Sequence, residues 1–272
     1  MLGCSRYTYT RNLSLSEGSF EVTRPPIIDG VKKELTTFNN NEISADISFG
    51  KNQSIPLNSI EQNDSTIANI EYDLTLFTCG LQYKRLQKFR NHLMVGGGGG
   101  LMPYPYVFAI GGINTKHFEF GLNAHLGVGY GEVNYAGTAH WEKERGLSNW
   151  DLYDDFDNEA GDTTFTAKDD FFHFYIGAGF FTSVYVFNFA LSYSGTIVEP
   201  EFYNYQLPAP HTFHGSNEYT IDIPFPYLYM HNVGISRTIQ DKYQIEFCVL
   251  HIVGSQLKKE PWAMDMKLSY IF

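Results

Sequence analysis

The chain closes with the stretch Trp262-Ala-Met-Asp-Met-Lys-Leu-Ser-Tyr-Ile-Phe272, and this stretch decides the fold. Every second position carries a large apolar side chain: Trp262, Met264, Met266, Leu268, Tyr270 and Phe272. The positions between them are mostly small or polar. Because alternate side chains of a β-strand point to opposite faces of its sheet, the stretch predicts a strand with one apolar and one largely polar face.

The same alternation recurs from about residue 41 onward. It is clearest over 117–130, where apolar residues hold the even positions and His, Glu, Asn and Gly hold the odd ones. A helical period of 3.6 would scramble this order within two turns, so the segment predicts a strand. Past Tyr130 the parity breaks at Val133, which predicts a bulge near Gly129 or Gly131, or the exit of the strand from a membrane. Further candidate strands cover 43–49, 70–76, 93–100, 104–110, 172–180, 185–193 and 243–249. The segment 225–238 alternates less clearly, because His231 lies among its apolar positions.

Connections between these strands alternate in length. Long and mostly polar segments cover 50–66, 141–170, 200–224 and 255–261, and short ones lie near 85–91, 114–116, 182–184 and 239–242. This alternation fits about ten strands if a tight hairpin lies at Met102-Pro103. The alternative is about eight strands, with 92–113 as one long strand and 43–49 outside the sheet.

Composition narrows the class of protein. Aromatic residues make up 16% of the 272 residues, with 19 Tyr and 22 Phe. No run of about 18 apolar residues occurs, so the sequence predicts no transmembrane helix. The net charge of -11 provides no basic patch for nucleic acid. We expect no metal and no other cofactor, because the three cysteines lack ligand spacing and Gly96 to Gly100 lack the Lys-Ser/Thr of a phosphate loop.

The terminal aromatic strand, the repeated alternation and the loop asymmetry together resemble bacterial outer-membrane β-barrel proteins, as a class rather than as one family. The resemblance implies an all-β fold, a closed antiparallel transmembrane β-barrel over residues 41–272, with the apolar face toward lipid. It also implies residence in the bacterial outer membrane, contact with its lipid and lipopolysaccharide, and insertion by the barrel-assembly machinery.

Residues 1–40 are predicted to be a polar leader, because they show little core-forming pattern. No charged and then apolar region precedes Cys4, so a complete signal peptide is not expected. Leu2-Gly3-Cys4 resembles the end of a bacterial lipoprotein signal and makes Cys4 a candidate lipid anchor. The alternative is a chance cysteine near the start.

Strand parity directs a set of charged and histidine side chains toward the enclosed lumen. Buried charges need partners, so these residues predict a hydrogen-bonded network that fills a narrow barrel, with a proton or solute path as the alternative. The predicted network consists of Glu71, Asp73, Glu119, His125, His173, Glu246, Asp265 and Lys267. The same parity places Cys79 and Cys248 on the lumen side.

Two loops carry motifs with chemical meaning. His214-Gly-Ser216-Asn217 resembles the His-x-Ser-Asn motif of outer-membrane lipid A deacylases, which implies a His base acting on a Ser nucleophile. Asp155-Phe-Asp157 is similar to half of the omptin protease site, but no Asp-x-His supplies the other half. The acidic 141–170 loop departs from a calcium loop at Ala160 and Thr166.

The expected function is that of a non-enzymatic integral outer-membrane barrel with a structural, adhesive or partner-binding role. Its long external loops would meet an extracellular protein or glycan. The alternatives are an outer-membrane hydrolase, with His214, Ser216 and Asn217 as candidate catalytic residues, and a narrow solute channel.

Overall fold

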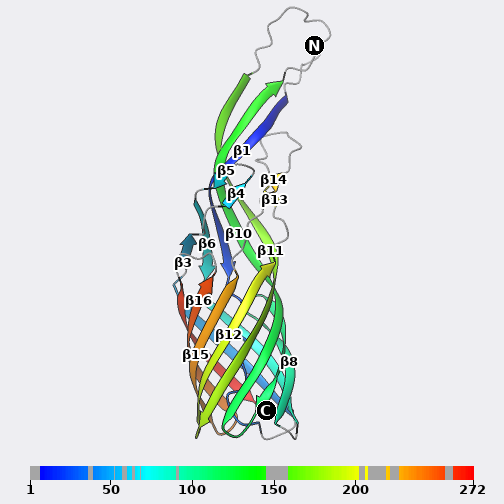
Figure 1. Ribbon diagram of the computed structural model, residues 1–272, viewed down its shortest axis with the longest axis vertical. Helices are drawn as coiled ribbons and strands as arrows, with labels where there is room; N and C mark the ends of the chain where they lie inside the picture. The colour runs from blue at the N-terminus through cyan, green and yellow to red at the C-terminus, as the bar shows by residue number, and fades with distance from the viewer. Residues whose placement is uncertain are drawn as a thin grey trace, which may run out of the picture.

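The computed structural model describes residues 7–35, 39–51, 53–56, 60–62, 65–67, 69–89, 92–144, 159–201, 206–207, 219–220, 227–254 and 260–272. Across these residues the regular structure is β-strand (Figure 1). No described helix is long and apolar enough to cross a membrane.

The central unit is a closed antiparallel barrel of ten strands. Neighbouring strands pair antiparallel around the whole ring, since β17 pairs with β2 and β10 pairs with β11. The prediction of about ten strands is therefore confirmed, and the eight-strand alternative is wrong. In chain order the barrel strands are β2 (Asn39–Gly50), β7 (Thr78–Lys88), β8 (Leu93–Leu101), β9 (Pro105–Asn114), β10 (Phe118–Glu144), β11 (Glu159–Val186), β12 (Phe189–Glu201), β15 (Leu228–Ile239), β16 (Tyr243–Gly254) and β17 (Trp262–Ile271).

The barrel is apolar outside and polar inside. On β2, Ile43 and Phe49 are 48% and 52% exposed, whereas Glu42 and Ser44 are 4% and 1% exposed. Most strands of the ring repeat this inversion of a water-soluble core, although β9 turns the apolar side chains of Tyr106, Phe108 and Ile110 inward. Because hydrocarbon offers no partner for unpaired backbone groups, only a closed ring can face lipid in this way, so the protein is a transmembrane β-barrel.

The observed strand map differs from the predicted one at two places. Residues 70–76 were expected in the ring, but β6 (Asn69–Thr75) pairs with β1 and β3 outside it, and β7 fills that place. The turn expected at 182–184 lies instead at Phe187-Asn188, where Phe187 has a positive φ of 55°. The tight hairpin at Met102-Pro103 is confirmed, with the Met102 amide donating to the Tyr104 carbonyl.

A sheet projects from the end of the barrel that carries the long loops (Figure 1). It consists of the upper parts of β10 and β11, joined by β1 (Tyr7–Thr23), β6 and β3 (Gln53–Pro56). The β10–β11 register is uninterrupted from Phe118 to Lys143, so the parity change after Tyr130 marks the exit from the barrel and not a bulge. Two further antiparallel pairs, β4 (Ile60–Gln62) with β5 (Ser65–Ile67) and β13 (Gln206–Leu207) with β14 (Tyr219–Thr220), complete the described strands.

Residues 24–35 form a plug inside the barrel. They follow β1, contain no regular secondary structure, and are almost entirely buried. Ile28, Val31 and Leu35 are at most 1% exposed, and so is Arg24. This segment was expected to be part of a polar leader. Its apolar residues follow no regular spacing along the chain, because the segment packs against the surrounding wall on all sides and not against a single sheet face.

Inward-facing glycines make room for large rings in the wall. A Cβ on Gly127 would lie 2.2 Å from the Tyr175 hydroxyl oxygen, and one on Gly129 would lie 2.2 Å from the His173 ring. The register places each ring directly across from its glycine on the neighbouring strand. Such cross-strand pairs let an aromatic ring lie flat over the glycine backbone. The run Gly96 to Gly100 serves the same purpose, since Gly98 and Gly100 face the rings of Phe108 and Tyr106.

Candidate functional site

The plug is held by buried ion pairs at the middle of the lumen. The Lys32 ammonium contacts the carboxylates of Asp29, also in the plug, and Glu246 on β16. The Lys267 ammonium on β17 lies 3.4 Å from Asp29 Oδ1 and 3.8 Å from Glu42 Oε1. Buried charges are tolerated only when they are paired and hydrogen-bonded. Each charge here has an opposite partner, so the plug and wall depend on each other.

Two further cations fasten the plug to the wall. Arg24 donates through Nη2 to both carboxylate oxygens of Asp265, at 3.1 Å each. Lys84 on β7 pairs with Glu42 at 2.9 Å and donates to the Gly30 carbonyl at 2.8 Å. The Lys84 side chain therefore joins a wall carboxylate to the plug backbone.

Glu119 on β10 accepts hydrogen bonds directly from the plug backbone. Its carboxylate accepts hydrogen bonds from the Val31 amide at 3.0 Å, the Lys32 amide at 2.9 Å and the Tyr185 hydroxyl at 2.8 Å. Two backbone amides without a sheet partner are satisfied by one side chain. Gly30 precedes these amides, and a Cβ there would lie 1.9 Å from Glu119 Oε1.

The lower end of the plug is tied to β9 and β7. Asn114 Oδ1 accepts from the Leu35 amide at 2.9 Å, and Asn114 Nδ2 donates to the Lys33 carbonyl at 2.9 Å. Lys88 donates to the Leu35 carbonyl at 2.8 Å. The plug is thus bonded to the wall along its whole length.

Four predicted network residues take part in this arrangement: Glu119, Glu246, Asp265 and Lys267. His125 and His173 are also buried in the lumen wall, at 4% exposure each. No residue that the structure describes hydrogen-bonds either ring nitrogen of His125, which packs edge-on to Tyr175. The two histidines belong to the aromatic wall, where the His173 ring lies beside those of Phe171 and Tyr175.

Glu71 and Asp73 were expected in the lumen, and that placement is wrong. Both lie on β6, which runs beside β1 in the projecting sheet. Their alternation with Tyr72 and Leu74 reflects that sheet, and strand parity alone cannot tell the two surroundings apart. Cys79 is likewise exposed on the outer face, whereas Cys248 is buried.

Sequence reasoning missed Arg24, Asp29 and Lys32 in the plug and Glu42 and Lys84 in the wall. The two wall residues lie at inward positions of β2 and β7, so correct strand limits would have revealed them. The plug residues carry no such signal, because their partners lie far away in sequence, as Arg24 and Asp265 do.

A cavity of about 580 Å³ lies at the lower end of the plug, beside Lys33, His117 and Phe189. Farther up, beside Arg24, the space is small. A cavity of about 40 Å³ is bounded by Arg24, Met102, Asn232, Cys248 and other residues. Each water molecule needs roughly 10–15 Å³ of such volume, so the cavity holds a few waters and no larger solute. Among the described residues, no group of three or more His, Cys, Asp or Glu side chains could hold a metal ion.

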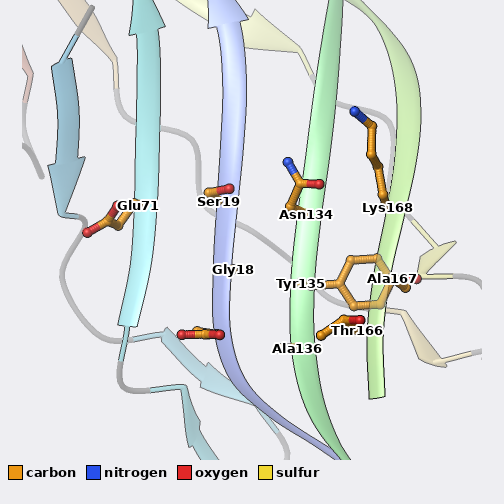
Figure 2. Close-up of a pocket in the computed structure, with 10 residues that line it drawn as sticks. Gly18, Ser19, Glu71, Asn134, Tyr135, Ala136, Thr166, Ala167 and Lys168 are labelled. Carbon is orange, nitrogen blue, oxygen red and sulfur yellow. The ribbon is translucent and has the colours of Figure 1, made fainter.

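A groove of about 610 Å³ lies on the projecting sheet (Figure 2). Figure 2 shows Glu71 on one side of the groove, Lys168 on the other, and the Tyr135 ring beside Ala167. Lys168 pairs with Glu132 across β10 and β11. The floor crosses four neighbouring strands and is formed by Glu17, Gly18, Ser19, Glu71, Asn134, Tyr135, Ala136, Thr166, Ala167 and Lys168.

The remaining predicted sites lie outside the described residues. These are the lipid-anchor candidate Cys4, the candidate catalytic residues His214, Ser216 and Asn217, and the pair Asp155 and Asp157. Each of them stays a prediction from sequence.

No protein-family model and no curated protein matches the chain. Similar solved structures include the outer-membrane protease OmpT from Escherichia coli, at 12% identity and a TM-score of 0.44 over 86% of this chain and 96% of that one. An outer-membrane channel from Pseudomonas putida F1 is 8% identical, with a TM-score of 0.38 over 90% and 100% of the two chains. The translocator domain of the autotransporter NalP from Neisseria meningitidis is 8% identical, with a TM-score of 0.32 over 88% and 90%. Similarity at this level concerns the barrel shape and says nothing of activity.

Proposed function

We propose that the protein is an integral outer-membrane barrel, closed to solutes, that presents its projecting sheet to a partner outside the cell. The observation that carries the proposal is the combination of a plugged lumen with a groove beyond the barrel. A barrel whose interior is filled by its own chain has its free surface at the projecting end. A polar extracellular protein or glycan is the partner that this surface fits.

Residence in the outer membrane is supported by the strand architecture. Transmembrane β-barrels with an even number of strands, short turns at one end and long loops at the other are typical of that membrane. On this proposal the short turns face the periplasm. The long loops and the projecting sheet then face outward.

The chemistry of the groove supports recognition of a polar ligand. Its floor offers hydroxyl groups from Ser19 and Thr166, an amide from Asn134, and charges of both signs from Glu71 and Lys168. The Lys168 side chain is 60% exposed, so it can reach a partner without leaving Glu132 buried and unpaired. Several modest hydrogen bonds spread across four strands provide specificity through their geometry.

Adhesion of whole cells tests this proposal. Bacteria displaying the protein are applied to arrays of immobilised glycans and extracellular-matrix proteins, alongside bacteria lacking it. We expect added adhesion to at least one ligand class, and about a tenfold loss in the double variant Asn134→Ala, Lys168→Ala, since two such hydrogen bonds account for roughly 1.4 kcal/mol or more.

The matched control is the double variant His140→Ala, Asp162→Ala. This pair also joins β10 to β11, at 2.8 Å, but lies outside the groove. It should leave adhesion unchanged. Equal adhesion by cells with and without the protein, or equal loss in the two variants, would contradict the proposal.

The non-enzymatic part of the proposal has its own test. Ser216→Ala should leave the acylation pattern of lipid A unchanged, as measured by mass spectrometry of lipid from cells expressing either form. A pattern that changes with the protein and reverts with Ser216→Ala would instead establish a hydrolase.

A further inference from the structure

A row of aromatic rings crosses the outer face of the barrel near its long-loop end. It consists of Tyr193, His231, His251 and Trp262, which lie on the consecutive neighbouring strands β12, β15, β16 and β17. His251 stands directly opposite His231 on one side and Trp262 on the other. We call these four residues, with Glu260 beside them, the outer row.

The outer row is joined by contacts along its whole length. The Tyr193 hydroxyl lies 2.9 Å from His231 Nδ1. The rings of His231 and His251 have centroids 6.3 Å apart, and those of His251 and Trp262 stack at 4.0 Å. Glu260 Oε2 lies 2.9 Å from His251 Nε2.

Its position on the strands marks a membrane boundary. Toward the short-turn end, the next outward residues on these strands are Val233, Val249 and Met264, which are 59%, 42% and 65% exposed. Toward the long-loop end, β17 begins at Trp262 itself. Histidine and glutamate are costly within hydrocarbon, whereas Trp and Tyr favour the headgroup level. The outer row therefore lies where lipid headgroups meet the barrel.

The outer row presents unused polar atoms to that layer. No described residue bonds to His231 Nε2 or His251 Nδ1, since each histidine uses its other nitrogen for Tyr193 or Glu260. With the Tyr193 hydroxyl donating to Nδ1, His231 Nε2 carries a hydrogen that it can donate to a phosphate oxygen. His251 donates from Nε2 to Glu260, so its Nδ1 can accept from a sugar hydroxyl, as the Glu260 carboxylate can. Trp262 is 57% exposed and offers a flat apolar surface to the carbon-bound hydrogens of a sugar ring.

We infer that the outer row binds the phosphorylated sugar headgroup of a glycolipid in the outer leaflet. A glycerophospholipid headgroup provides phosphate but no sugar ring for Trp262 or hydroxyl array for Glu260. The inference rests on the proposed outer-membrane location. It assigns to the barrel wall a ligand separate from any partner of the groove.

Binding to purified protein in detergent tests the inference. The probes are monophosphoryl lipid A and, for comparison, phosphatidylglycerol of matched acyl length, with complexes counted by native mass spectrometry. We expect lipid A to bind about tenfold more tightly than phosphatidylglycerol. The double variant His231→Ala, His251→Ala should bind lipid A about tenfold more weakly, because one hydrogen bond to the phosphate and one from a sugar hydroxyl are lost.

The matched control is Tyr243→Ala with Tyr270→Ala. These rings also face outward on β16 and β17, 5.3 Å apart, but at the opposite rim. They should leave lipid A affinity within about twofold, a difference well below 1 kcal/mol. A second variant, Trp262→Leu, keeps the apolar surface and should still lose several-fold.

Two results would overturn the inference: unchanged affinity in the histidine variant, or equal affinity for both lipids. Heat-modifiable gel migration shows that each variant has folded. Adhesion through the groove is measured separately, so loss of one activity does not imply loss of the other.

Discussion

Gly30 lies directly against the wall residue Glu119. The Glu119 carboxylate occupies the space where any side chain at position 30 would begin, 1.9 Å from the ideal Cβ. The φ of Gly30 is not positive, so the requirement for glycine is one of space and not of backbone conformation.

Gly30→Ala should therefore loosen the plug. Either Glu119 or the plug backbone must move, and the bonds to Val31 and Lys32 lengthen as a result. We expect faster cleavage within 24–35 by a protease added to the detergent-folded protein. The control is Gly111→Ala, since nothing lies within 4 Å of a Cβ at Gly111. Equal cleavage rates for the two variants would contradict this prediction.

Glu119 should be the most sensitive single side chain of the lumen. Glu119→Leu leaves the amides of Val31 and Lys32 buried without acceptors, at a cost of roughly 1–3 kcal/mol each. Tyr185→Phe removes one of the three hydrogen bonds to Glu119 and the one that Asn114 donates to the Tyr185 hydroxyl, while Asn114 keeps its bond to the Lys33 carbonyl. It should cost about 1–2 kcal/mol. Urea unfolding in detergent, followed by tryptophan fluorescence, compares the two variants. A smaller loss in Glu119→Leu than in Tyr185→Phe would show that the plug amides have other acceptors.

At the scale of elements, most barrel strands could be predicted from alternation, but β7 could not. Its outward face includes Arg85 and its inward face includes Leu86, so the order of polar and apolar residues is mixed. β6 alternates well and was placed in the barrel for that reason. Leu74 is fully buried in the projecting sheet. Alternation therefore indicates a sheet with one apolar and one polar face, but it does not indicate whether lipid, water or other strands cover the apolar face.

The plug could not be predicted for a different reason. Its charges, Asp29 and Lys32 among them, pair with residues on β16 and β17 that are distant in sequence. The spacing of apolar residues along the sequence indicates only local structure. A segment that is surrounded by protein on all sides has no regular spacing of apolar residues to detect. Half of the network could be predicted from the sequence because its residues lie on regular strands. These residues are Glu119, Glu246, Asp265 and Lys267.

Replacing the plug should open the barrel. When 24–35 are exchanged for a glycine-serine segment of equal length, the apolar and ionic anchors are lost while β1 remains attached. We expect current steps in planar lipid bilayers from this variant and a flat baseline from the unmodified protein. Current through the unmodified protein would show that the plug does not close the lumen, and silence from both would show that wall side chains suffice to close it.

At the scale of the whole molecule, the exposed apolar belt predicts how the protein behaves in solution. Large side chains such as Leu122 and Phe247, at 61% and 57% exposure, need lipid or detergent around them. Continuous backbone pairing around the ring should also resist unfolding by dodecyl sulfate at room temperature. We expect the detergent-extracted protein to migrate as a compact species before boiling and more slowly afterward. Recovery as a dispersed monomer without detergent would contradict the membrane placement of the belt.

The plug also changes how many times the polypeptide traverses the membrane. Ten strands alone would return the chain to the side from which it started. The descent through the lumen adds an eleventh passage, so β1 and the final Phe272 lie at opposite ends of the barrel (Figure 1). An epitope joined ahead of Tyr7 and one joined after Phe272 would consequently report on different compartments.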